Sequence, residues 1–249
     1  MKKIEDQSSL LFLDFDGVIC DSLDECFVSS WIAYYEKYKS AVPDRIDLEY
    51  RRQFDSLRPL IRNGEDYLVI HHALASGQSI TDQSEFDHRI ESVGDVSMKQ
   101  FRALMYEVRK GLVEHSRDYW LGLHAMFSWL MPTLAAAAEH PCVYILSTKR
   151  KEYILELLDG VPIDRARVLS SNGRPKTEII TEYLDATAAD NAVFVDDQID
   201  HLRMVGDKRI RPLLAEWGYV KPEWLLSGEF PVLSQAGAVR LVGGYSSVS

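Results

Sequence analysis

The sequence predicts an α/β fold, with a doubly wound, Rossmann-like core built on a parallel sheet and an inserted all-helical subdomain. Four short apolar runs that end in polar or charged residues are typical of strands covered on both faces. Helical patterns separate the last three runs, and this alternation of strand and helix indicates a parallel sheet. Residues 16–141 separate the first two runs, which is far more than one crossover helix needs, so a further subdomain is expected there.

The predicted elements of the core follow the chain in order. Strands are expected at 10–15, 142–147, 166–171 and 191–197. Helices are expected at 151–160 and 176–186, where apolar residues recur on one side of a helical wheel. An earlier helix is expected over 122–140, kinked or ended near Pro132, and it leads into the second strand.

The residues between the first two strands have a helical pattern, without the alternation of a strand. Ser22 and Glu25 form a capping-box signature at the start of one helix, and Ser97 with Gln100 forms a second one at the start of a later helix. We therefore expect a core formed by residues 1–20 and 119–249, and a helical subdomain at 21–118.

The composition narrows the classes of function. The chain of 249 residues has a formal net charge of −10, which argues against nucleic acid or an anionic membrane as a partner, because both need a basic face. No apolar run approaches the roughly 20 residues of a membrane span, and the first residues do not resemble a signal peptide. The three cysteines show no metal-ligand spacing, which favours a reduced, cytoplasmic setting. We expect a cytoplasmic monomer or homodimer.

Acidic and hydroxyl side chains follow the predicted strands at their carboxyl ends, where an open parallel sheet binds its ligand. These residues are Asp14, Asp16, Ser147, Thr148, Asp196 and Asp197. Four neighbouring carboxylates repel one another unless a cation or protons neutralise them. Oxygen ligands without a cluster of His or Cys favour Mg²⁺, which commonly binds together with a substrate phosphate.

Four segments in this order resemble the four motifs of the haloacid dehalogenase-like hydrolase superfamily: DFDGV, ILST, RPKTEII and FVDDQID. The helical insertion directly after the first motif is similar to the helical-cap branch, the phosphoglycolate phosphatase-like group. The segment LAEWGYV at 214–220 also resembles a recurrent segment downstream of the fourth motif in that branch. The resemblance covers 9–22 and 120–225, and it implies a haloacid dehalogenase-type core with a helical cap.

The resemblance implies catalytic roles for individual residues. Asp14 would be the nucleophile, Asp16 would be the acid and base, and Ser147 would bind the phosphoryl oxygens. Lys176 would neutralise the nucleophile and the phosphate, and Arg174 would otherwise fill this role and contact the substrate. Members that cleave carbon–halogen bonds lack the second aspartate, so Asp16 favours phosphoryl transfer.

The metal ligands that the resemblance implies are Asp14, Asp16 through its backbone carbonyl, and Asp197, with Asp196 beside it. Thr148 offers a second hydroxyl to the substrate or caps the following helix. Without the other motifs, an aspartate pair at a strand end would instead indicate a turn or a helix N-cap.

The inserted subdomain is expected to close over the site as a lid and to select the substrate. Arg58 and Arg62 would bind a carboxylate or a second phosphate on the leaving group of the substrate. The alternative for these arginines is a solvated helix face with partners four residues apart, as expected for Arg51 and Asp55.

Together these features predict a Mg²⁺-dependent phosphatase that hydrolyses a small phosphorylated metabolite through an aspartyl-phosphate on Asp14. A sugar-phosphate phosphomutase of the same superfamily is one alternative, and a non-catalytic binding or regulatory relative is another. The motifs leave the physiological substrate open, because one fold serves many substrates.

Overall fold

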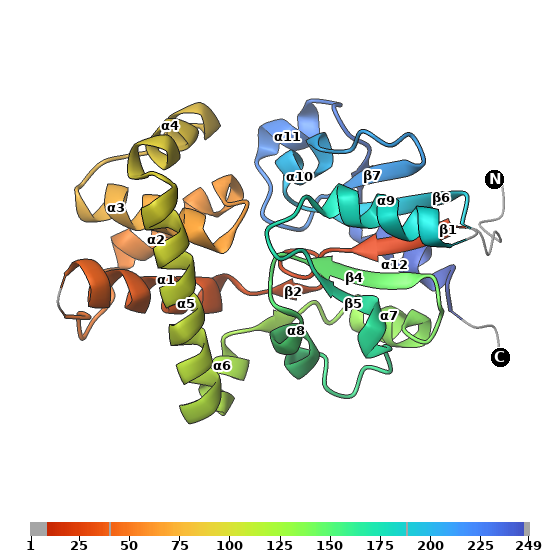
Figure 1. The fold of residues 1–249 in the computed structure, drawn as a ribbon, viewed down its shortest axis with the longest axis horizontal. Coiled ribbons are helices and arrows are strands. Elements are labelled where there is room, and N and C mark those ends of the chain that lie inside the picture. The colour runs from red at the N-terminus through yellow and green to blue at the C-terminus, as the bar shows by residue number, and fades with distance from the viewer. Residues whose placement is uncertain (1–8, 40, 188, 247–249) are drawn as a thin grey trace. The chain divides into compact units, whose positions relative to one another are not determined.

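The computed structural model describes residues 9–39, 41–187 and 189–246 and contains two compact units (Figure 1). The core unit is formed by the described residues of Met1–Asp21 and Met126–Ser249. The helical unit is Ser22–Ala125. The chain leaves the core unit through β2 (Cys20–Asp21) and returns through β3 (Ala125–Met126), and these two segments form a small two-stranded sheet.

In the described residues, the core unit contains a six-stranded sheet in the order β5-β4-β1-β6-β7-β8, and every neighbouring pair is parallel. The strands are β1 (Ser9–Leu13), β4 (Val143–Ser147), β5 (Val168–Ser170), β6 (Asn191–Asp196), β7 (Ile210–Ala215) and β8 (Val232–Leu233). This sheet confirms the predicted fold class and the four predicted strands. The sequence did not predict β7 or β8.

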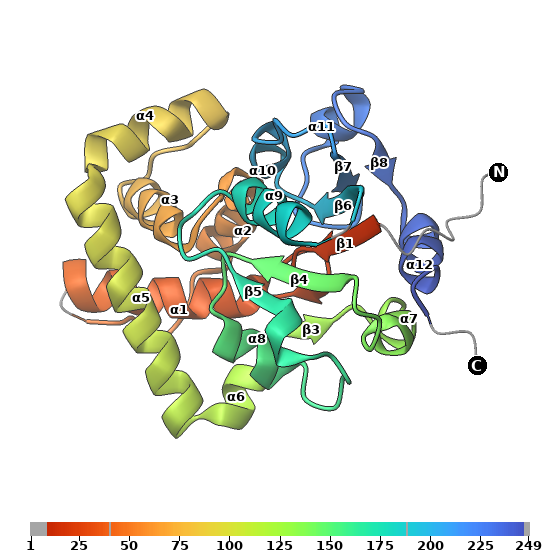
Figure 2. The same cartoon turned by 45° about the vertical axis from the view of Figure 1, so that its right-hand side comes forward.

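Two hydrophobic clusters cover the sheet, one on each face, and the side chains of β1 alternate between them. Leu11 and Leu13 of β1 point into the cluster that contains residues of α7 (Met131–Ala137), α8 (Lys151–Leu157) and α12 (Gln235–Gly243). Leu10 and Phe12 point into the cluster with α9 (Lys176–Ala186), α10 (Ile199–Arg203) and α11 (Pro222–Leu226). Figures 1 and 2 show α9 and α10 on the side of the sheet opposite to α7 and α8, which is the doubly wound arrangement.

The helical unit is built around a second hydrophobic core rich in aromatic side chains. Its α-helices are α1 (Leu23–Tyr38), α2 (Leu48–Leu57), α3 (Tyr67–Ala75), α4 (Gln83–Val93), α5 (Asp95–His115) and α6 (Arg117–Gly122). Short 3₁₀ turns occur at Arg58–Leu60 and Gly64–Asp66, and a third lies in the core unit at Arg165–Arg167. Phe27 and Phe54 are fully buried, and their rings meet edge to face with centroids 4.9 Å apart.

Three local predictions were wrong, each for a physical reason. The helix expected over 122–140 begins only at Met131, because Pro132 lies in its first turn, where a missing N–H costs nothing. Ser22 makes no side-chain capping bond to α1, and the carboxylate of Glu25, the other half of the predicted capping box, pairs with Arg109. Helix α5 begins at Asp95 after a glycine with positive φ, so Ser97 lies inside the helix.

None of the helices within the described residues combines the length and the apolar character that crossing a membrane would require.

Candidate active site

The first and fourth motifs meet because their strands are neighbours in the sheet. β1 and β6 pair with Leu13 opposite Val195, so Asp14 and the end of β6 lie at the same carboxyl edge. The backbone N–H of Asp14 donates to the carbonyl of Val195 at 2.9 Å, which continues the pairing by one residue. The backbone N–H of Phe15 donates to Asp14 Oδ1 at 2.7 Å and orients the carboxylate.

Lys176, the first residue of α9, lies between two of the predicted carboxylates. Its Nζ is 2.8 Å from Asp14 Oδ2 and 2.7 Å from Asp196 Oδ2, and all three residues are buried. Burial alone would lower the pKa of Lys176, but the two carboxylates outweigh it and raise the pKa. Lys176 therefore stays protonated in this environment.

The same contacts act differently on the two carboxylates. Burial raises the pKa of Asp14, and Lys176 offsets this only in part. Burial also works to raise the pKa of Asp196, but Lys176 and His201 outweigh it and hold the pKa below its usual range. An added cation beside Asp14 would favour the ionised form that a nucleophile requires.

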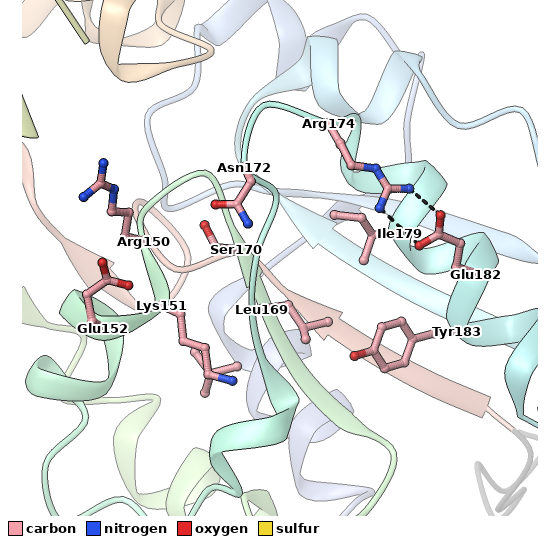
Figure 3. Close-up of a pocket in the computed structure, with 11 residues that line it drawn as sticks. Arg150, Lys151, Glu152, Leu169, Ser170, Asn172, Arg174, Ile179, Glu182 and Tyr183 are labelled. Atoms are coloured by element: carbon pink, nitrogen blue, oxygen red, sulfur yellow. Dashed lines mark hydrogen bonds and ion pairs between the residues drawn. The ribbon is translucent and has the colours of Figure 1, made fainter. Parts of the chain in front are cut away.

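Arg174, the alternative to Lys176, pairs with Glu182 of α9 and lies 3.8 Å from Glu178. It lines a pocket of about 480 Å³ beside the edge strand β5, together with Ser170 and Tyr183 (Figure 3). Lys176, and not Arg174, thus occupies the position next to Asp14.

Asp16 has a cationic neighbour that the sequence did not suggest. Lys149 Nζ lies 3.2 Å from Asp16 Oδ1, and the lysine side chain is only 2% exposed. Lys149 follows the end of β4 by two residues. Its place just beyond a predicted strand end was the available signal.

His201, in α10, is a second residue that sequence reasoning missed. Its Nδ1 is 3.1 Å from Asp196 Oδ2, while the backbone N–H of Gln198 donates to Asp196 Oδ1 at 2.8 Å. Ligand atoms of Asp14, Asp196 and His201 all lie within 4.8 Å of one another. No pattern in the sequence marked His201, because its contact depends on how α10 begins.

Asp197 lies against the turn of the first motif. Gly17 has φ +83°, and a Cβ atom on it would lie 2.1 Å from Asp197 Oδ2. The backbone N–H of Tyr219 donates to the same carboxylate oxygen at 2.7 Å. A residue with a side chain at position 17 would displace Asp197.

The hydroxyl residues of the second motif lie at the end of β4. Ser147 is 1% exposed, pairs with Ser170 of β5 and accepts a hydrogen bond through Oγ from the backbone N–H of Lys149 at 3.3 Å. Thr148 follows it and is half-buried. Their roles toward a phosphate stay predictions.

The two predicted arginines of the inserted subdomain have contacts within the helical unit. Arg58 is buried, with its guanidinium 6.0 Å from the ring centre of Tyr67. Arg62 pairs with Asp87. Their predicted contact with a substrate stays a prediction.

The residues at this edge fit a hard divalent cation. Asp14, Asp16, Asp196 and Asp197 supply four carboxylates, against the two ammonium groups of Lys149 and Lys176. The carboxylates outnumber the ammonium groups, and carboxylate oxygens are ligands that Mg²⁺ prefers.

Comparisons with known proteins show which solved structures share this fold. No family model and no curated protein matches the sequence. A predicted phosphoglycolate phosphatase from Lactobacillus delbrueckii subsp. bulgaricus superposes with a TM-score of 0.61 at 12% identity, over 97% of this chain and 99% of that chain. A haloacid dehalogenase-like hydrolase from Streptococcus pneumoniae superposes with a TM-score of 0.53 at 14% identity, over 91% of this chain and 93% of that chain. A β-phosphoglucomutase from Clostridium difficile superposes with a TM-score of 0.52 at 11% identity, over 95% of this chain and 96% of that chain. The shared feature at these identities is the fold.

Proposed function

We propose that this chain, which has the fold of haloacid dehalogenase-like hydrolases, is a Mg²⁺-dependent phosphatase of a small phosphorylated metabolite. The observation that carries the proposal is the buried Lys176 between Asp14 and Asp196. An anionic carboxylate attacks an anionic phosphoryl group only where fixed positive charge offsets their repulsion. Lys176 supplies such a charge beside the proposed nucleophile.

In the first step, a carboxylate oxygen of Asp14 forms a bond to phosphorus, and the bond from phosphorus to the ester oxygen breaks. The departing oxygen takes a proton from the carboxyl group of Asp16 and leaves as an alcohol. Asp14 then carries the phosphoryl group as an aspartyl-phosphate, and Asp16 is ionised. Lys149, 3.2 Å from Asp16, stabilises this charge between the two steps.

In the second step, a water molecule gives a proton to Asp16 and attacks phosphorus. The bond between phosphorus and the Asp14 oxygen breaks, which releases inorganic phosphate and restores both side chains to their starting states. Asp14, Asp16 through its carbonyl, Asp196 and Asp197 would hold Mg²⁺, which would add positive charge beside the phosphoryl oxygens.

A sugar-phosphate phosphomutase is the second candidate, because a β-phosphoglucomutase shares the fold. A mutase would pass the phosphoryl group from Asp14 to a second sugar hydroxyl instead of to water. The two activities differ in one product, since only the phosphatase releases inorganic phosphate from every turnover.

Removal of the metal is expected to abolish activity. With an aryl phosphate as substrate, excess EDTA should lower phosphate release on the order of 100-fold or more, and excess Mg²⁺ should restore it, because without the cation the carboxylates of the site repel the anionic phosphoryl group. Phosphate release by the protein after complete chelation, confirmed by metal analysis, would remove the metal from the proposal.

A panel of phosphorylated metabolites distinguishes the remaining alternatives. Release of inorganic phosphate from the aryl phosphate and from at least one metabolite supports the phosphatase. Isomerisation of a sugar phosphate without phosphate release supports the mutase. A protein that binds phosphorylated compounds, but turns over none of them, is the non-catalytic relative.

A further inference from the structure

The segment 217–219, which lies just after β7, contacts several parts of the proposed site. The indole N–H of Trp217 donates to the carbonyl of Val18 at 3.1 Å, in the turn of the first motif. The backbone N–H of Tyr219 donates to Asp197 Oδ2 at 2.7 Å, in the fourth motif. The proposed chemistry assigned no role to this segment, although it lies within the recurrent LAEWGYV stretch.

Gly218 allows the backbone of this segment to approach Asp197 closely. A Cβ atom at position 218 would lie 2.3 Å from Asp197 Cβ and 2.7 Å from the carbonyl oxygen of Gly17. Both distances are far below normal van der Waals separation, so only glycine permits this approach without displacing Asp197 or the Gly17 turn. The close approach is what brings the N–H of Tyr219 to the carboxylate.

The side-chain hydroxyl of Tyr219 also forms a hydrogen bond, to a different carboxylate from the one that its backbone N–H binds. It donates to Asp21 Oδ1 at 2.6 Å, and Asp21 is the last residue of β2, where the chain leaves the core unit. The two polar ends of Tyr219 therefore bind two different carboxylates. A tyrosine has only two side-chain torsions, so anchoring its hydroxyl restricts its backbone as well.

We propose that Tyr219 is a positioning residue for Asp197, and that its hydroxyl bond to Asp21 maintains the position of the N–H that orients the Asp197 carboxylate. The inference rests on the proposed function, in which Asp197 is a metal ligand. Residues that orient metal ligands by hydrogen bonds typically change metal affinity by about 10-fold to 100-fold when they are altered.

The test measures metal affinity and catalysis in the full-length protein carrying Tyr219→Phe, which keeps the ring and the backbone N–H and removes only the hydroxyl. Binding of Mn²⁺ is followed by the electron paramagnetic resonance signal of free Mn²⁺, and Mg²⁺ affinity is obtained by competition. We expect affinity for both ions to fall about 10-fold, with the Mg²⁺ concentration that half-saturates turnover rising by the same factor. Tyr183→Phe is the matched control, since Tyr183 packs on Phe12 and Tyr144 in the core unit, and its metal affinity should equal that of the unaltered protein.

Variants of Asp21 separate positioning from a general effect on stability. Asp21→Asn keeps an acceptor for the hydroxyl and should retain near-normal metal affinity, whereas Asp21→Ala should match Tyr219→Phe. The double variant Tyr219→Phe/Asp21→Ala should be no weaker in metal binding than either single change, because both remove the same bond. Unchanged metal affinity in Tyr219→Phe, whether or not its melting temperature falls, would overturn the positioning role. Failure of the unaltered protein to bind Mg²⁺ or to release phosphate would instead overturn the proposed function.

Discussion

Asp14→Asn is expected to lower kcat for phosphate release on the order of 10⁴-fold or more, the largest catalytic effect that the site predicts. The amide has nearly the same shape as the carboxylate but lacks the oxygen nucleophile that would bond to phosphorus. Lys176 would keep its contact with Asp196, so the surroundings should remain folded. The measurement is release of inorganic phosphate from an aryl phosphate, with circular dichroism to verify the fold.

Asp207→Asn is a matched control for this experiment, because it makes the same chemical change elsewhere in the core unit. Asp207 contacts Arg209 and Thr181, and its substitution should leave kcat nearly unchanged. Rapid acid quenching should trap a phosphorylated protein in the unaltered chain and none in Asp14→Asn. Equal rates of phosphate release by the unaltered protein and by Asp14→Asn would show that Asp14 is not the nucleophile.

Each strand that the sequence predicted contains a short apolar run. The strand β7, which the sequence did not predict, shows where this pattern fails. Pro212 in the middle of IRPLLA argues against a strand inside a sheet, because proline donates no ladder hydrogen bond. In the structure, the N–H groups of Leu214 and Glu216 point to the β8 side and donate to Pro231 and Leu233. Residues 212, 214 and 216 alternate along β7 and just beyond it, so the backbone nitrogen of Pro212 also faces β8. The pairing with β8 begins only at Leu214, so the missing N–H of Pro212 costs no hydrogen bond.

The residues of the candidate site also divide into those that local sequence patterns indicate and those that they do not. Asp14, Asp196 and Lys176 could be predicted because each lies at the end of a strand or the start of a helix, where local pattern determines position. The contact of Lys149 with Asp16 and the contact of Tyr219 with Asp197 could not be predicted, since each depends on the close approach of segments far apart in the chain. Local patterns identify which residues reach the edge of the sheet, but they do not identify which side chains orient them.

A different limit of local reasoning appears at Glu25, which the sequence suggested as a capping residue. Its carboxylate is fully buried and forms a two-point ion pair with Arg109: Nε lies 2.6 Å from Oε1, and Nη2 lies 2.9 Å from Oε2. Ser29 also donates to Oε1 at 2.6 Å. The pair joins α1 to α5 across 84 positions of sequence, which no local motif could indicate.

Glu25→Leu is therefore expected to destabilise the helical unit by about 3–5 kcal/mol, because it leaves the buried guanidinium of Arg109 without its counter-charge. Hydrogen exchange of backbone amides in α1 and α5 measures this directly, since it reports the opening of a particular unit of structure. A loss of about 3 kcal/mol corresponds to exchange that is roughly 150-fold faster for amides that exchange through opening of the whole unit.

The double variant Glu25→Leu/Arg109→Met tests whether the loss comes from the unpaired charge or from the packing of α1 on α5. Removing both charges avoids the cost of burying either of them, so the double variant should recover most of the stability lost in Glu25→Leu. Arg52→Met, which breaks the exposed pair with Glu49 in α2, is the control and should change exchange by less than about threefold. If the double variant exchanges as fast as Glu25→Leu, shape rather than charge joins α1 to α5. If it recovers, the ion pair stabilises the helical unit chiefly because each charge, once buried, requires the other.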